Sequence, residues 1–192
     1  MARLTQEQRQ AATRRKLLES ARELFARDGY GGTSIEAISD NAGYSKGAFY
    51  PNFTGKEAIF LEVLKQYSDS GLTELLASLD GSTSVEDAIE RVARWADDRS
   101  RDGNWSLLLL EYVRHAKQND HFGREQEQIL KAAWIQLGQR LASIGEADPG
   151  APEILGAIVF ELVFAPAMTF MTEPTAGDLV RFALTAMLRK TP

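Results

Sequence analysis

Apolar side chains recur every three or four residues along almost the whole of this chain. The clearest early example is the stripe formed by Leu17, Leu18, Ala21, Leu24 and Phe25. Such spacing places apolar groups on one face of an α-helix, whereas a half-buried strand alternates every second residue. Convincing alternation with β-branched residues is almost absent. The chain is therefore predicted to be all-α, with about nine helices.

Capping signals divide this periodic pattern into separate helices. A serine or threonine followed three residues later by an acidic residue or glutamine can satisfy the free N–H groups of a helix start. Pairs of this kind stand at four expected helix starts: Thr5–Gln8, Thr54–Glu57, Ser84–Asp87 and Thr175–Asp178. Asp28–Gly29 is expected to end the first helix, because glycine readily adopts positive φ. After the helix that starts at Thr54, further helices are predicted at about 84–99, 105–119, 122–144, 152–171 and 176–189.

Two prolines and one leucine run refine the later helices. Pro152 suits a first helical position, and Pro166 is expected to kink the apolar stretch around it. The run "LLLLEY" at 107–112 is apolar on too many sides for a surface helix, so it is predicted to be buried centrally.

The net charge of −5 at pH 7 conceals an uneven distribution. Residues 1–56 contain nine Lys or Arg and six Asp or Glu, whereas residues 57–192 contain thirteen and twenty-one. A mildly basic head on an acidic body allows the head alone to bind a polyanion. With no cysteine and only His115 and His121, the chain offers no disulfide and little basis for a metal site, and we expect no cofactor.

Nothing in the sequence suggests export or a membrane. No charged and apolar leader opens the chain, and no apolar run approaches the roughly 18 residues that a membrane span requires. We therefore expect a cytoplasmic protein that makes no membrane contact.

The segment "GYSKG" at 43–47 allows two interpretations. As G-x-S-x-G it matches the nucleophile elbow of an α/β-hydrolase, with Ser45 as nucleophile, but an elbow needs a buried strand before the serine. Residues 33–42 instead predict a capped helix, and strands for a parallel sheet are absent. The better interpretation is a helix-turn-helix over about 34–53, and a non-enzymatic protein.

In a helix-turn-helix the second helix enters the major groove of DNA end-on. Ser45 could cap this helix and also donate to a phosphate, and Lys46 is positioned for a guanine edge or a phosphate. Gly47 and Ala48 are small enough to let the backbone approach base edges. Tyr50, one turn after Lys46, presents a hydroxyl. Two aromatic residues of the same segment, Phe49 and Phe53, are predicted to be core.

The segment "LLESARELFARDGYGGTSIEAISDNAGYSKGAFYPNFTGKEAIF" resembles the N-terminal domain of the TetR/AcrR family of transcriptional regulators. The resemblance spans roughly residues 9–65 and implies that the recognition helix runs from Ser45 to about Tyr50. It implies base, groove or phosphate contacts for ten residues. These are Thr33, Ser34, Glu36, Ser45, Lys46, Gly47, Ala48, Tyr50, Asn52 and Lys56. Asn52 departs from a frequent histidine, and Pro51 from a larger residue.

The same resemblance assigns residues 1–53 to DNA binding and residues 54–192 to effector binding and dimerisation. It places a homodimer face in the helices at about 152–171 and 176–189. The residues that could supply apolar area there are Ile154, Leu155, Ile158, Leu162, Leu179, Phe182 and Leu188. Aromatic residues of the body become candidates for lining an effector pocket. They are Trp95, Trp105, Tyr112, Trp134, Phe160 and Phe164.

The resulting hypothesis is a ligand-responsive repressor that binds a palindromic double-stranded operator as a homodimer. A small apolar or aromatic effector would release it. The alternative hypothesis is a helical small-molecule or partner-binding module without operator binding, which the net acidity and the Pro51–Asn52 departures leave open.

Overall fold

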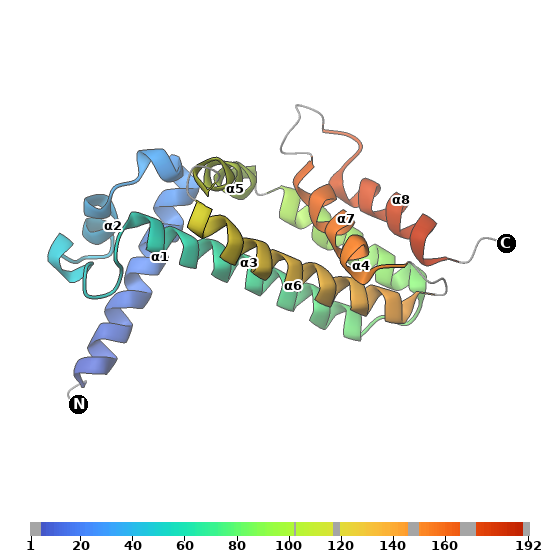
Figure 1. The fold of residues 1–192 in the computed structure, drawn as a ribbon, viewed down its shortest axis with the longest axis horizontal. Coiled ribbons are helices and arrows are strands. Elements are labelled where there is room, and N and C mark those ends of the chain that lie inside the picture. The colour runs from blue at the N-terminus through green and yellow to red at the C-terminus, as the bar shows by residue number, and fades with distance from the viewer. Residues whose placement is uncertain (1–4, 102, 117–119, 146–149, 166–171, 190–192) are drawn as a thin grey trace. The chain divides into compact units, whose positions relative to one another are not determined.

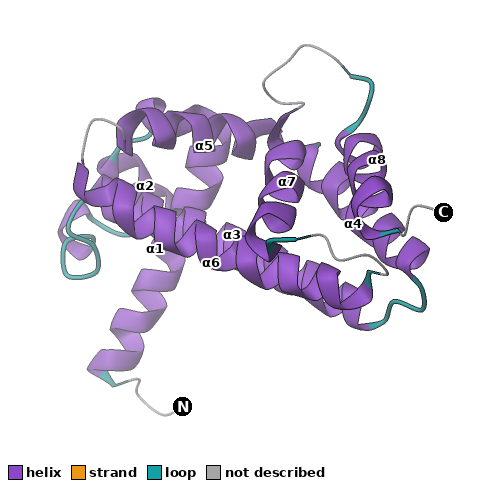
Figure 2. Ribbon diagram, turned by 45° about the vertical axis from the view of Figure 1, so that its right-hand side comes forward, coloured by secondary structure: helices purple, strands orange, loops and turns teal. Residues whose placement is uncertain are grey.

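The computed structural model describes residues 5–101, 103–116, 120–145, 150–165 and 172–189. Every regular element within these ranges is helical, as predicted, and Figure 2 shows them all in purple. The elements are α1 (Gln6–Gly32), α2 (Ile35–Asn41), η1 (Lys46–Ala48), α3 (Lys56–Asp80), α4 (Val85–Ser100), α5 (Gly103–Ala116), α6 (Asp120–Ile144), α7 (Pro152–Phe164) and α8 (Ala176–Leu188). None of these described helices is long and apolar enough to cross a membrane.

The chain forms two compact units, and α3 contributes to both. Unit 1 comprises residues 1–69 together with 107–112, and unit 2 comprises residues 70–106 and 113–192. Unit 1 therefore continues beyond residue 53, where the sequence suggested a functional boundary, and it includes a segment of α5.

The core of unit 1 forms around the predicted stripe of α1. Leu17, Leu18, Ala21, Leu24 and Phe25 are all buried, as their spacing predicted. The Phe25 ring meets the Phe60 ring of α3 edge-on, with centroids 4.9 Å apart. Tyr30 lies against both rings, at 5.9 and 4.6 Å.

The helix starts follow the capping signals in most places. Thr5 and Gln8 form a complete capping box at α1, Thr175 and Asp178 form another at α8, and Ser84 caps α4. The start of α3 differs, because this helix begins at Lys56 rather than at Thr54. Gly29 has the predicted positive φ of 72°, but it produces a kink, and α1 continues from there to Gly32.

Unit 2 is built from long helices that pack closely, mainly α6 on α7 and α4 on α8 (Figure 1). Glycine makes the first contact possible. A Cβ on Gly156 of α7 would lie 1.9 Å from the carbonyl oxygen of Trp134, and one on Gly138 of α6 would lie 1.7 Å from that of Pro152. The α4–α8 contact includes a carboxylate, because Asp97 accepts a 2.7 Å hydrogen bond from the Gly177 N–H.

Two predictions about the later helices meet different outcomes. Pro152 begins α7, as predicted, whereas Pro166 lies outside the described residues. The prediction that 107–112 is buried centrally is wrong for Leu107 and Leu110, which are exposed, although Leu108 is buried. A helix that packs through one face cannot bury leucines on all sides, whatever its composition.

Candidate nucleic-acid interface

The turn between α2 and η1 is held by short polar contacts. The Ser34 hydroxyl caps α2 by accepting from the Ala37 N–H at 3.0 Å. At the other end Gly43 adopts a φ of 77°, which glycine tolerates far better than other residues. The buried Ser20 hydroxyl of α1 donates to the Ile38 carbonyl at 2.8 Å and accepts from the Asn41 amide at 3.0 Å. These bonds fix α2 against α1.

The second element of the motif is shorter than the sequence predicted. The expected helix from Ser45 to about Tyr50 is a single 3₁₀ turn, η1, followed by further turns to Asn52. Ser45 occupies the N-cap position, but its side chain makes no capping hydrogen bond, so that prediction is wrong. The shortness of this helix has a local reason, because Pro51 has no N–H to donate and its ring disfavours helical geometry at Tyr50.

Two buried rings anchor this short segment. Phe49 and Phe53 are buried, as predicted, with ring centroids 5.5 Å apart. The Arg14 guanidinium lies 4.2 Å over the Phe53 ring, donates to the Asn52 carbonyl and pairs with Glu62. With its apolar residues fixed inward, the segment presents Ser45, Lys46, Gly47 and Tyr50 to solvent.

Two charged residues of the predicted site contact each other across the motif. Lys46, the first residue of η1, forms an ion pair with Glu36 of α2. The hydrogen bond from Lys46 lowers the pKa of Glu36, and the same bond raises the pKa of Lys46. Both side chains are about half exposed, so an anionic and a cationic group stand together on the outer surface of the motif.

Three other predicted contact residues are engaged inside unit 1. Thr33 is buried, and its hydroxyl donates to the Gly29 carbonyl at 2.8 Å. The Asn52 amide donates to the Ala48 carbonyl at 2.8 Å. The Lys56 ammonium donates to the carbonyls of Tyr30 and Thr33 at 2.9 and 3.0 Å. Partial burial lowers the pKa of Lys56.

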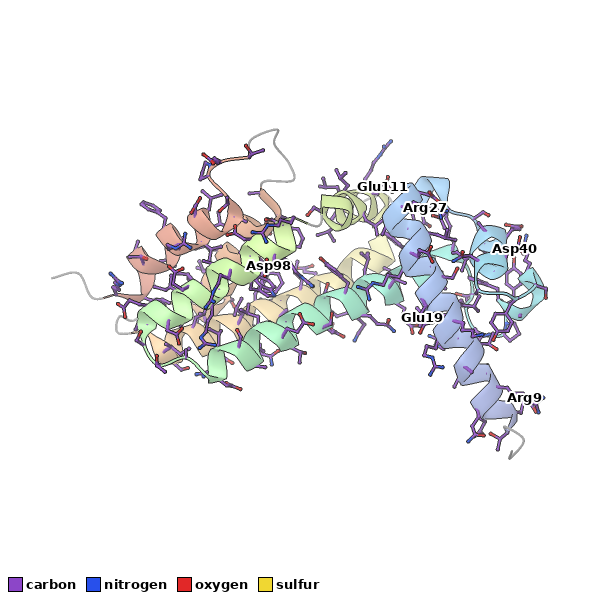
Figure 3. The ribbon with its side chains drawn as sticks, turned by 180° about the vertical axis from the view of Figure 1, so that it is seen from behind. Arg9, Glu19, Arg27, Asp40, Asp98 and Glu111 are labelled. Carbon is purple, nitrogen blue, oxygen red and sulfur yellow. The ribbon has the colours of Figure 1, made fainter. Side chains whose placement is uncertain are left out.

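Sequence reasoning missed one residue that belongs with this group. Glu111 of α5 accepts a 2.8 Å hydrogen bond from the Tyr30 N–H, just after the kink at Gly29, and Figure 3 labels it beside the end of α1. Glu111 is the only charged residue of the run "LLLLEY", but nothing in the sequence connects it to a site about eighty positions earlier. Lys56 and Glu111 thus hold the carbonyls and the N–H of one short segment.

The nucleophile-elbow interpretation of Ser45 is wrong. The residues before Ser45 form the helix α2 and a glycine turn, and the described part of the chain has no sheet on which an elbow could sit. An elbow projects its serine from the end of a buried strand.

The structure describes four of the six predicted pocket residues. Trp95, Trp134, Phe160 and Phe164 are half-buried, whereas the side chains of Trp105 and Tyr112 lie outside the description. Trp95 meets the Phe160 ring edge-on at 6.3 Å, and its indole N–H donates to the Gly71 carbonyl at 3.2 Å. The indole nitrogen of Trp134 is buried without a hydrogen-bond partner. An effector pocket at these residues stays a prediction.

Comparisons with known proteins agree with this geometry. The model of the family described as "Bacterial regulatory proteins, tetR family" matches residues 17–63. The uncharacterized HTH-type transcriptional regulator YuxN of Bacillus subtilis is 43% identical over 60 residues, which are 31% of this chain and only 21% of that protein. The HTH-type transcriptional repressor AcnR of Corynebacterium diphtheriae is 25% identical over 142 residues, covering 72% of this chain and 70% of the repressor.

A solved structure extends the likeness to most of the fold. The transcriptional regulator SCO7518 from Streptomyces coelicolor superposes with a TM-score of 0.71 over 92% of this chain and 98% of its own. Its sequence identity is 20%, so the agreement concerns the fold.

Proposed function

We propose that this chain is a member of the tetR family of bacterial regulatory proteins, whose model matches residues 17–63, and that it is a cytoplasmic transcriptional repressor. It binds a palindromic operator as a homodimer and leaves it when a small effector binds, without catalysis. The observation that carries the proposal is the exposed segment from Ser45 to Tyr50, anchored from below by Phe49 and Phe53.

The exposed segment suits entry into a major groove. Gly47 and Ala48 add little side-chain bulk to the outer surface of η1, so the backbone can approach base edges. The Ser45 hydroxyl makes no capping bond, which leaves it able to donate to a phosphate. Tyr50 is 52% exposed and carries its hydroxyl on the same segment. Lys46 supplies a cation for a guanine edge or a phosphate.

The remaining predicted contact residues act mainly by shaping this surface. Ser34 caps α2, while Thr33, Asn52 and Lys56 donate to backbone carbonyls around the motif. An ammonium has three donors, and Lys56 uses two of them on these carbonyls, so it can still offer one to a phosphate. The net positive charge of residues 1–56 favours the approach of DNA to this unit.

Exposed apolar residues of α7 and α8 support a homodimer. Ile154 is 56% and Phe182 is 81% exposed, and a contact between two copies would remove this apolar surface from water. Leu155 and Leu188, also considered for this face, are fully buried and belong to the core. A symmetric contact between α7 and α8 of two copies would bring two segments Ser45–Tyr50, one from each copy, to one palindrome.

The proposed effector is a small apolar or aromatic molecule bound in unit 2. The half-buried aromatics Trp95, Trp134, Phe160 and Phe164 would supply apolar contact, and the unpartnered indole N–H of Trp134 would supply one donor. Because α3 runs through both units, a shift of its second half can reach the DNA-binding unit. A difference in effector affinity of about 1–3 kcal/mol between the two forms is enough to change operator occupancy markedly.

Selection from a pool of random duplex DNA tests the proposal. The purified full-length protein is expected to enrich a palindrome whose half-sites are about one helical turn apart, or a multiple of that distance. Lys46→Ala should weaken binding to the enriched sequence by roughly 1–3 kcal/mol. Lys65→Ala, which removes an exposed ion pair to Asp69 within α3, is the matched control and should bind as the wild type does. Enrichment of no sequence would favour a module without operator binding.

A further inference from the structure

The Glu36–Lys46 ion pair differs from the other ion pairs of unit 1. Lys65–Asp69 joins residues one turn apart on a single helix, and Arg14–Glu62 sits over the anchoring Phe53 ring. Glu36–Lys46 instead joins the two elements of the reading motif and is about half exposed at both ends. An exposed pair of this kind contributes little to stability, typically about 0–1 kcal/mol. Its position therefore calls for an explanation other than folding.

The pair presents an acceptor and a donor side by side at hydrogen-bonding distance. In a Watson–Crick C·G pair, the cytosine N4 amino group and the guanine O6 atom are also neighbours joined by a hydrogen bond. Seen from the major groove, this base pair shows one donor followed by two acceptors, guanine O6 and N7. A carboxylate facing the amino group and an ammonium facing both acceptors would match it atom for atom.

From this match we propose that Glu36 and Lys46 read one C·G base pair as a unit in each half-site. Glu36 accepts from the cytosine N4 amino group, and Lys46 donates to guanine O6 and N7. The inference rests on the proposed function and assigns to the pair a base identity and a direction.

The other base pairs fit the ion pair less well. In an A·T pair the single donor, adenine N6, lies between two acceptors, adenine N7 and thymine O4. With the carboxylate on N6, the ammonium would find a single acceptor, adenine N7 or thymine O4, instead of the two adjacent acceptors of guanine, and on the thymine side the methyl group would lie next to it. A reversed G·C pair would put the carboxylate against guanine O6. The reversed G·C pair places an acceptor against the carboxylate, and the A·T pair offers the ammonium fewer acceptors, so both are bound less well than C·G.

Keeping the two residues paired also favours binding. A lone lysine or a lone glutamate would lose hydrogen bonds to water on entering the groove, and base contacts would replace only some of them. In the proposed complex each charged group keeps its neighbour and gains base contacts, so neither is left as an isolated buried charge. The contact between the side chains also restricts their rotamers before DNA arrives, which reduces the entropy lost on binding.

The experiment compares sequence preferences selected from random duplex DNA by four full-length proteins. These are the wild type, Glu36→Ala, Lys46→Ala and the control Lys65→Ala. Circular dichroism verifies that each variant is folded before selection. The wild type is expected to enrich a C·G pair at one position of each half-site, with a preference of roughly 5- to 150-fold over the other base pairs. Glu36→Ala and Lys46→Ala should both lose the preference at that same position and keep it elsewhere, and Lys65→Ala should keep it throughout.

The outcomes separate this inference from the proposed function. If the two variants lose preference at different positions, or at a shared A·T pair, the two residues do not read one C·G pair and the inference is overturned. A uniform loss of affinity in Lys46→Ala with every preference intact would assign Lys46 to a phosphate contact, and unchanged preferences in Glu36→Ala would leave Glu36 without a base contact; either result also overturns it. If the wild type itself enriches nothing, the proposed function fails as well. If Glu36→Ala unfolds, Glu36→Met, which keeps the length of the side chain but has no carboxylate to accept from cytosine, replaces it and should lose the same preference.

Discussion

The contacts that stabilise unit 1 internally differ in kind from those that stabilise unit 2. In unit 1, polar side chains bond to backbone carbonyls: Ser20 to Ile38, and Lys56 to Tyr30 and Thr33. In unit 2, long helices pack through apolar faces and approach closely at Gly138 and Gly156.

The difference follows from helix length. A long helix satisfies most of its N–H and C=O groups internally, so it needs only an apolar face to pack. The seven residues of α2 and the three of η1 leave most of their backbone groups without an internal partner. Side chains must supply those partners, because buried backbone groups are seldom left unpaired. The reading surface of unit 1 therefore depends on a few individual residues, whereas unit 2 depends on the fit of whole helices.

The largest effect is expected from removing Phe49, the buried ring that anchors the segment Ser45–Tyr50. Phe49→Ala deletes a fully buried ring and should lower the free energy of unfolding of unit 1 by about 3–5 kcal/mol. All three tryptophans lie in unit 2, so their fluorescence reports on that unit. Hydrogen exchange should show loss of protection in α2 and around η1, while the urea transition seen by tryptophan fluorescence stays in place. Equal shifts in both measurements would show that the units unfold together.

A methyl group at a close contact between α6 and α7 is expected to have the next largest effect. Gly156→Ala forces a Cβ against the Trp134 carbonyl, and α6 and α7 must move apart, at about 2–3 kcal/mol. The urea midpoint followed by tryptophan fluorescence should fall accordingly. Gly55→Ala is the matched control, because its added Cβ meets no atom within 4 Å. If both variants unfold at the same urea concentration, the tight contact between α6 and α7 is not what holds unit 2.

Removing the Lys56 donor tests the polar side of the comparison. Lys56→Met leaves the Tyr30 and Thr33 carbonyls without this partner and should destabilise the segment around them by about 1–2 kcal/mol. Faster hydrogen exchange in residues 30–41 is the expected observation, with Lys65→Met as control. Lys56 would instead be assigned to a phosphate contact if hydrogen exchange were unchanged and the slope of the logarithm of operator affinity against the logarithm of salt concentration fell in magnitude by about one.

The smallest expected effect is a change in the free energy of unfolding with pH. The N–H of Thr175 holds the pKa of Asp178 below its ordinary value. A carboxylate with a lowered pKa in the folded state contributes stability above its unfolded pKa, near 4, and loses it as the pH falls through the folded value. Asp178→Asn should therefore be slightly less stable than the wild type at pH 7, and the difference should shrink at pH 3. A difference that is constant with pH would mean that the carboxylate charge is not involved.

Much of unit 1 could be predicted from local patterns. The α1 stripe, the burial of Phe49 and Phe53 and the capping box at Thr5 all appear as expected, because each depends on neighbours within a turn or two of helix. The length of η1 was overestimated, although Pro51 was already visible as a limit. The burial of Leu107 and Leu110 was predicted wrongly, because composition does not say which face of a helix finds a partner.

The candidate site shows the same division at the level of single residues. Glu36 and Lys46 were predicted as separate contacts, ten positions apart, and the structure brings them together. Thr33 has a sequence signature common to exposed caps, yet the fold buries it and directs its hydroxyl to Gly29. The role of Glu111 had no signal in the sequence, because its partner at Tyr30 is distant along the chain.

Local patterns in the sequence predict the helical class, most helix starts and the resemblance to tetR-family regulators, because periodicity, caps and the motif around Ser45 are local properties of the chain. Tertiary contacts settle which polar groups stay available to DNA and which are used internally. That choice depends on contacts between residues far apart in sequence, and a hydrogen-bonding group already satisfied by the fold has correspondingly less to offer a ligand.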